Sequence, residues 1–232
     1  TIVGAGWAVL QPLALMIVYS VFLGGLLEVP TGNIPYPLFV FSGLVVWTYF
    51  STSMTIASQS LVANQALVTK VYFPRVLIPL SGVLTGLVDV AATMLVLLIM
   101  LPIFGQSLTW SILLVPLFVG LAALAAFGVG LWLGATNVRF RDIQHVLPLI
   151  SQVWFFSTPI SYPSDLLGSG LARLFYSLNP MYGVVEGFRA AVLGTPMPPW
   201  WSLAISTAVV LVLVISGLFY FVRMEPTFAE VI

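Results

Sequence analysis

Asp89 is the residue whose type and position most directly suggest chemistry. It is the only ionisable residue deep within a long apolar run of this 232-residue chain. A carboxylate is costly to place in lipid, so such a residue is first interpreted as a functional group, for example a proton-binding site. Thr85 and Thr93 lie four residues to either side on the same helical face and could hydrogen-bond the carboxylate. Because no second carboxylate completes a proton relay, the pattern favours a structural role for Asp89.

The sequence does not contain the other groups that catalysis or metal binding requires. It has no Cys, and its one His, His145, stands in a charged segment where we expect it to be solvated. We find no nucleophile with a base and no paired carboxylates, which predicts no catalytic residues, no metal site and no cofactor in this chain. The single Lys, Lys70, does not follow the glycines of a phosphate-binding loop, so a separate subunit must supply any ATP-binding site.

The composition places the chain in a membrane. Hydrophobic residues make up 60% of the chain and charged residues only 6%, whereas an ordinary soluble domain carries about 25% charged residues. Seven Lys and Arg residues balance seven Asp and Glu residues, so there is no basic surface for nucleic acid. We therefore expect an integral membrane protein that contacts membrane lipid and has no nucleic-acid partner.

Six apolar runs are long enough to cross a bilayer as helices, which takes about 20 residues. They cover approximately residues 2–27, 37–61, 76–104, 111–135, 146–162 and 200–222. The fifth run is shorter than the others and is interrupted by Pro148 and Pro159. The sequence predicts an all-α integral membrane fold in which six transmembrane helices form a single domain over residues 1–232.

The positions of Lys and Arg predict the orientation of these spans, because basic residues accumulate in cytoplasmic loops. Five of the seven basic residues fall on one face: Lys70 and Arg75 follow the second span, Arg139 and Arg141 follow the fourth, and Arg223 follows the sixth. We therefore expect both termini to be cytoplasmic.

The apolar segment 164–194, before the last span, predicts two short helices that are separated by Asn179 and Pro180. Each is too short to be a span, so we expect two re-entrant helices on the extracytoplasmic side. Glu186 and Arg189, at i and i+3, could pair and so lower the cost of charge near lipid. A solvated surface ion pair is the alternative.

The segment SLVANQALVTKVYFPR, between the second and third spans, predicts a cytoplasmic helix that continues to about Lys70 and is interrupted by Pro74. Its apolar side chains and two cations fit either a helix on the membrane surface or a docking surface for a soluble partner.

Several segments resemble the type-2 ABC exporter permeases that move lipid-linked O-antigen, capsular polysaccharide or teichoic acid across the bacterial inner membrane. These segments are, in order, GAGWAVLQPL, PYPLFVFSGLVVW, KVYFPRVLIPLSGVLTGLVDV, NVRFRDIQHVLPLISQVWFFSTPISYP, NPMYGVVEGFRAAVLG and RMEPTFAEVI. The resemblance implies a homodimer that binds two copies of a cytoplasmic nucleotide-binding ATPase subunit, which would hold ATP and Mg²⁺. It also implies an amphipathic segment ahead of Thr1.

The resemblance assigns roles to individual residues. Coupling to the ATPase subunit would involve Lys70, Tyr72, Phe73, Pro74, Arg75, Arg139, Arg141 and Asp142. The translocation path would be lined by Trp47, Tyr49, Phe50, Trp154, Phe155 and Phe156, whose rings can stack on sugars, although each could instead face lipid or pack internally. The extracytoplasmic gate would include Asn179, Pro180, Glu186 and Arg189.

These observations predict the transmembrane subunit of an ATP-driven exporter of a lipid-linked polysaccharide in the bacterial inner membrane. One alternative is an ABC permease for a drug or a lipid, which would have the same topology. The other is a secondary carrier or channel that needs no partner, and a proton-coupled carrier should lose transport on Asp89→Asn. An enzyme is disfavoured because the catalytic groups are missing.

Overall fold

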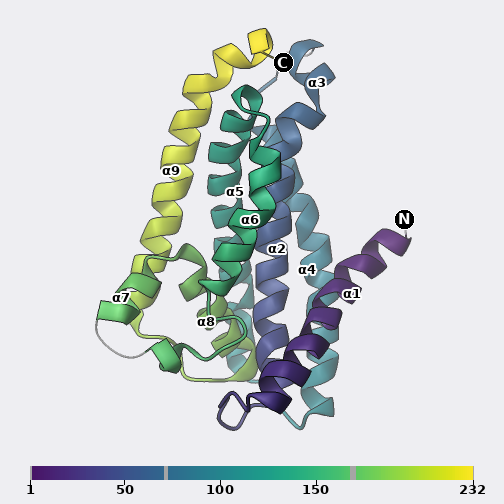
Figure 1. Ribbon diagram of the computed structural model, residues 1–232, viewed down its shortest axis with the longest axis vertical. Helices are drawn as coiled ribbons and strands as arrows, with labels where there is room; N and C mark the ends of the chain where they lie inside the picture. Colours follow the sequence, from purple (N-terminus) through teal and green to yellow (C-terminus); the bar gives the residue numbers. More distant parts are fainter. Residues whose placement is uncertain (1, 71–72, 168–170, 232) are drawn as a thin grey trace.

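The fold consists of helices joined by short connections (Figure 1). The computed structural model describes residues 2–70, 73–167 and 171–231, and none of these residues forms a β-strand. The α-helices are α1 (Ile2–Tyr19), α2 (Tyr36–Ala63), α3 (Gln65–Lys70), α4 (Leu77–Ile103), α5 (Val115–Arg139), α6 (Ile143–Phe156), α7 (Leu171–Ser177), α8 (Pro180–Leu193) and α9 (Trp200–Val231). A π-helical segment, η1 (Ser20–Leu26), extends α1, and two 3₁₀ turns are η2 (Trp110–Leu114) and η3 (Ser164–Leu167).

Five of the six predicted spans correspond to helical segments that are long and apolar enough to cross a membrane. These segments are Gly6–Leu26, Tyr36–Ala63, Leu77–Ile103, Trp110–Arg139 and Trp200–Pro226. Their bounds agree with the predicted ones to within a few residues. The prediction of an all-helical, multi-pass membrane protein is therefore confirmed.

The predicted fifth span takes a different form. Its helix, α6, has 14 residues and is about 21 Å long, which is short of the roughly 30 Å of a hydrocarbon core. The helix ends at Phe156 because Pro159 has no N–H and disfavours helical geometry at Thr158, the residue before it. After the exposed Ser157, the chain continues as a buried non-helical segment from Thr158 to Ser161. The six-span topology therefore stays a prediction.

α2 and α5 form the centre of the bundle, with α4 packed on α2 and α9 on α5 (Figure 1). Their close approach depends on small residues. A Cβ added at Gly130 of α5 would lie only 2.5 Å from the Cβ of Ala57 in α2. Small residues at helix contacts are a common way for membrane helices to associate, because they let the backbones come close.

α1 lies against α2 and α4 at the edge of the bundle (Figure 1). Half of its described residues are exposed, and it is the least embedded of the five long segments. One face of α2 is consequently left open between α1 and α6.

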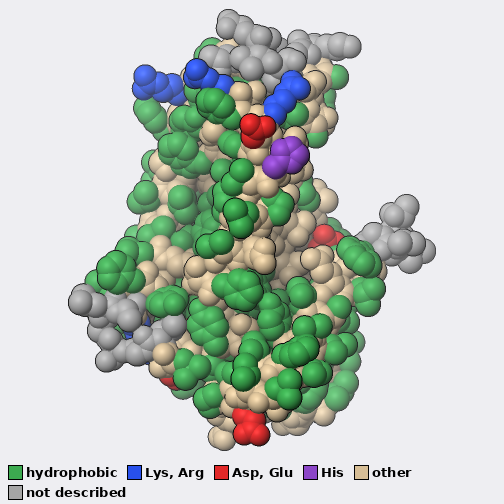
Figure 2. Space-filling view, in the orientation of Figure 1, with side chains coloured by type: hydrophobic (Ala, Val, Ile, Leu, Met, Phe, Trp, Pro, Cys, Tyr) green, Lys and Arg blue, Asp and Glu red, His purple; other side chains and the backbone are tan. Residues whose placement is uncertain are grey.

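The two ends of the bundle differ in charge. α3 and the end of α9 lie together, where Arg75 Nη1 donates to the carbonyl oxygen of Glu225 at 2.6 Å. Figure 2 shows Lys and Arg side chains gathered at this end, while α7 and α8 lie toward the other end (Figure 1). The gathering of Lys and Arg side chains at one end of the bundle agrees with the expectation that most basic residues lie on the same side of the membrane.

A polar groove as the candidate functional site

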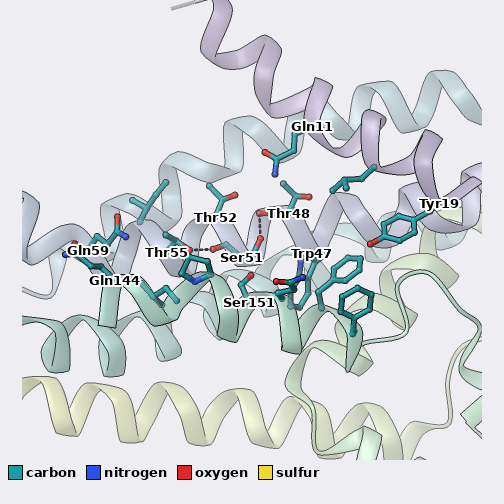
Figure 3. Close-up of a pocket in the computed structure, with 17 residues that line it drawn as sticks. Gln11, Tyr19, Trp47, Thr48, Ser51, Thr52, Thr55, Gln59, Gln144 and Ser151 are labelled. Atoms are coloured by element: carbon teal, nitrogen blue, oxygen red, sulfur yellow. Dashed lines mark hydrogen bonds between the residues drawn. The ribbon is translucent and has the colours of Figure 1, made fainter. Parts of the chain in front are cut away.

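A groove of about 590 Å³ opens between α1, α2 and α6. Figure 3 shows polar side chains from these three helices pointing into one shared space. The groove is lined by Gln11, Leu15, Tyr19, Trp47, Thr48, Ser51, Thr52, Thr55, Ile56, Gln59, Gln144, Leu147, Pro148, Ser151, Gln152, Phe155 and Phe156. Polar residues within membrane segments are costly and commonly mark a substrate pathway. We therefore take this polar groove as the candidate functional site.

α2 contributes a stripe of hydroxyl and amide side chains to the polar groove. Thr48, Ser51, Thr52, Thr55 and Gln59 recur at intervals of three and four residues, which places them on one helical face. Ser51 Oγ donates to the Thr48 carbonyl oxygen at 3.2 Å, and Thr55 Oγ1 donates to the Ser51 carbonyl oxygen at 2.8 Å. Because these two hydroxyl protons are used within the helix, the oxygens can act as acceptors toward a ligand.

The facing walls add amides and aromatic rings. Gln11 from α1 and Gln144 from α6 bring amide groups that can both donate and accept hydrogen bonds (Figure 3). The rings of Tyr19 and Phe155 stack with centroids 5.8 Å apart, and Trp47 meets Phe155 edge-on at 5.6 Å. The polar groove therefore offers both flat apolar faces and hydrogen-bonding groups, the combination that fits the two kinds of surface on a sugar ring.

The six aromatic residues predicted to line a path divide into two groups. Trp47, Phe155 and Phe156 line the polar groove. The others do not line it: Phe50 is fully buried between Trp47 and Trp154, and Trp154 lines an apolar groove on the opposite face of α6. Tyr49 donates to the Val83 carbonyl oxygen and lines a smaller cavity beside the polar groove. The path role of this second group stays a prediction.

The polar residues of the groove were not among the residues singled out from the sequence. Two signals mark them. The first is the spacing of Thr48, Ser51, Thr52, Thr55 and Gln59 within the second span. The second is the mean hydropathy of α2, which at 1.3 is the lowest of the five long segments, the others ranging from 1.9 to 2.6.

A smaller cavity of about 170 Å³ adjoins the polar groove between α1, α2 and α4. This side cavity shares Gln11, Thr48 and Thr52 with the groove and adds Asp89 and Ser53. Ser53 is fully buried, and its hydroxyl has no hydrogen-bond partner among the described residues. The side cavity thus brings a carboxylate beside the groove.

The expectation that Thr85 and Thr93 hydrogen-bond the Asp89 carboxylate is wrong. Thr85 Oγ1 donates to the Ser81 carbonyl oxygen at 2.8 Å. Thr93 Oγ1 lies 2.9 Å and 3.0 Å from the backbone carbonyl oxygens of Asp89 and Val90. Hydroxyls on a helix readily bond to carbonyls of the preceding turn. The carboxylate is therefore left available to the side cavity.

Asn179 connects the end of α6 to the start of α8. Its side-chain oxygen caps α8 by accepting from the Met181 N–H at 3.0 Å, and it also accepts from Trp154 Nε1 at 2.8 Å. Its Nδ2 donates to the Ser157 carbonyl oxygen at 3.1 Å and to Thr158 Oγ1 at 2.9 Å. A side-chain cap followed by Pro at the first helical position is typical of a helix start.

Arg189 is buried and forms an ion pair with Glu186. Its Nη2 donates to the carbonyl oxygens of Pro159 and Ile160 at 3.0 Å each, and its guanidinium carbon lies 3.7 Å from the centre of the Phe39 ring. Burial lowers the pKa of Arg189, an effect that the Glu186 carboxylate partly offsets. The predicted pair is confirmed, and the solvated alternative is wrong because the guanidinium is enclosed between α8, α2 and the segment after α6.

The predicted coupling residues lie around the basic end. Lys70 is the last residue of α3, and Phe73, Pro74 and Arg75 follow that helix. Arg139 is the last residue of α5, and Arg141 and Asp142 are exposed in the next turn. Tyr72 lies outside the described residues. Arg75 also bonds within the chain, since Nη2 donates to the Val68 carbonyl oxygen at 3.5 Å in addition to its bond to Glu225. The assignment of this set to coupling stays a prediction.

In the parts of the chain that the structure describes, no three His, Cys, Asp or Glu residues gather closely enough to hold a metal ion. A bundle of long apolar helices with a polar groove defines the chain as a membrane-transport domain. Residues 2–193 match the family model described as ABC-2 type transporter, and the chain belongs to this family.

Three relatives illustrate the similarity. An O-antigen export system permease protein RfbA from Myxococcus xanthus is 32% identical over 226 residues, which cover 97% of this chain and 86% of the relative. A protein of the same name from Klebsiella pneumoniae is 28% identical over 100% of this chain and 88% of the relative. The polysialic acid transport protein KpsM of Escherichia coli is 28% identical over 81% of this chain and 72% of the relative.

Proposed function

We propose that this chain is the transmembrane subunit of an ATP-driven transporter that exports a lipid-linked polysaccharide across the bacterial inner membrane. The observation that carries the proposal is the polar groove, in which hydroxyls and amides of α2 and α6 face aromatic rings. A glycan has hydroxyl groups around its rings and apolar faces on them, so both parts of this lining suit it. The names of the relatives support a polysaccharide as the cargo class.

The proposed assembly is a homodimer with two copies of a cytoplasmic ATPase. The polar groove is open along one side, and a second copy of the chain would close it into an enclosed path. The ATPase subunits, which bind ATP and Mg²⁺, would dock at the basic end, near α3 and the exposed Arg141 and Asp142. Both termini would then be cytoplasmic, and α6 with the segment 157–162 would complete the sixth crossing.

α7 and α8 would form the extracytoplasmic gate as re-entrant helices. Pro180 begins α8, and Asn179, Glu186 and Arg189 belong to networks that tie α8 to α2 and to the end of α6. A shift of α6 would therefore be transmitted to α8. ATP can drive such a shift only because its binding to the ATPase subunit favours one state of the assembly over the other.

The proposal is tested by expressing the chain with the ATPase encoded beside it in a bacterium that lacks its own polysaccharide permease. Export of polymer to the cell surface and co-purification of the ATPase from detergent are measured together. Ser151→Phe should fill the polar groove and abolish export while the ATPase still co-purifies, because Ser151 lines the groove away from the basic end (Figure 3).

Thr85→Phe is the matched control, since Thr85 is exposed on α4 and lines neither the groove nor the side cavity. Undiminished export by Ser151→Phe would contradict the groove as the path. Failure of any ATPase to co-purify with the unaltered chain would favour a carrier that works without a partner.

A further inference from the structure

We infer that the polar groove selects a glycan without acidic groups, and that Asp89 is the residue that enforces this selection. The inference rests on the proposed function and narrows its substrate class. It follows from the charges that line the path and from the positions of the cations in the fold.

The charge along the path is carried by one residue. Among the described residues that line the polar groove and the side cavity, Asp89 is the only charged one, and the others are amides, hydroxyls, aromatics and aliphatics. Gln11, Thr48 and Thr52 line both spaces, so the side cavity that holds Asp89 lies directly beside the groove. A glycan in the groove would therefore pass within reach of the carboxylate's field.

None of the basic residues of the sequence is among the described residues that line the polar groove. The basic residues are Lys70, Arg75, Arg139, Arg141, Arg173, Arg189 and Arg223. Two of these cations form ion pairs: Arg173 pairs with Asp165 at 3.1 Å, and the buried Arg189 pairs with Glu186. A second copy of the chain would bring the same set of cations.

An acidic polymer would meet an unfavourable field at every repeat. Like charges interact strongly where water is scarce, and a charge that is buried without a counter-ion is costly. A charge at the lipid-linked end would cross once, whereas an acidic sugar would bring a new negative charge past Asp89 with each repeating unit. The same lining favours a neutral glycan, because sugar hydroxyls can donate to the Asp89 carboxylate.

The test uses the complete transporter, with its ATPase, in a host that makes either a neutral polysaccharide or polysialic acid, a polymer of acidic sugars. The surface-exposed fraction of each polymer is measured, and the acidic fraction is divided by the neutral fraction. The unaltered chain should export the neutral polymer and retain the acidic one. Asp89→Asn should raise the ratio about tenfold. A tenfold change corresponds to about 1.4 kcal/mol, which is a modest share of the repulsion energy between two like charges at close range in a protein interior.

A second variant leaves Asp89 in place. Gln59→Lys puts a cation on the groove face of α2 and should also raise the ratio. Two controls should keep the ratio of the unaltered chain: Asp89→Glu, which preserves the charge, and Glu28→Gln, which makes the same kind of carboxylate-to-amide change in the exposed connection before α2.

The outcomes separate the inference from the proposed function. Equal export of both polymers by the unaltered chain overturns charge selection and leaves the exporter assignment standing. A ratio that neither Asp89→Asn nor Gln59→Lys changes overturns the role of Asp89. Export of neither polymer overturns the proposed function, and the inference with it.

Discussion

Trp154 donates its indole Nε1–H to the side-chain oxygen of Asn179 across 2.8 Å. Trp154 belongs to α6, whose other face forms a wall of the polar groove, and Asn179 is the cap of α8. One hydrogen bond therefore joins the groove wall to the helix that we propose as the extracytoplasmic gate.

Asn179→Ala is expected to lower the free energy of unfolding by about 2–3 kcal/mol, because it removes a helix cap and leaves the Trp154 N–H without its partner. The measurement is thermal unfolding of the purified protein in detergent. Asn33→Ala, in the exposed loop before α2, is the control and should leave the Tm unchanged. Equal Tm values for both variants would contradict the importance of this cap.

Arg189→Met is expected to destabilise the protein strongly, because it leaves Glu186 without its counter-ion in a mostly buried site. Breaking one side of a buried pair typically costs about 3–5 kcal/mol, whereas replacing both partners by apolar residues costs far less. The double variant Glu186→Met/Arg189→Met should therefore recover much of the loss in a denaturation experiment.

Arg173→Met is the matched control for this pair. Its partner Asp165 is almost fully exposed, and such exposed pairs contribute only about 0–1 kcal/mol. A loss as large as that of Arg189→Met would mean that burial does not explain the difference.

Gly130→Ala is expected to destabilise the contact between α2 and α5 by about 1–3 kcal/mol, the usual cost of overpacking. The new Cβ would lie 2.5 Å from the Cβ of Ala57. In a chain that already carries Ala57→Gly, the same change should cost little, because the clashing atom is gone. Double-mutant cycles measured by chemical denaturation check this coupling.

Gly120→Ala provides the control for helix propensity, since nothing lies within 4 Å of a Cβ added there. Ala is favoured over Gly in a helix by roughly 0.5–1 kcal/mol, so this variant should be neutral or slightly more stable. Destabilisation by Gly120→Ala would point to an effect of the helix itself.

Arg141→Glu is expected to weaken binding of the ATPase at least roughly tenfold while leaving the Tm unchanged, because Arg141 is exposed at the basic end. Arg75→Ala is expected to lower the Tm, because Arg75 bonds to carbonyl oxygens of Glu225 and Val68 within the chain. Pull-down of the ATPase and thermal unfolding measure the two effects separately. The reverse pattern would place the docking surface on Arg75.

The sequence alone was sufficient for the class of fold and for most of the spans. A bilayer requires long apolar segments whose backbone groups are satisfied within a helix, so composition and length predict where such helices lie. The short helices around Asn179 followed from local signals of the same kind, since Pro180 and Gly194 mark helix ends. The stripe from Thr48 to Gln59 was also present in the sequence, as a spacing within the second span.

The tertiary structure decided which helices meet, because a local sequence pattern holds no information about contacts between distant residues. Only the folded chain shows that this stripe faces Gln11 and Gln144. It also shows that Asp89 lines a side cavity and that Arg189 is buried. The spacing of residues places side chains on a face of a helix, but whether that face meets lipid, another helix or an open groove depends on partners far away in the sequence. The contact of Arg75 with Glu225, 150 residues apart, is of this kind, and so is the position of Asp89 beside the polar groove.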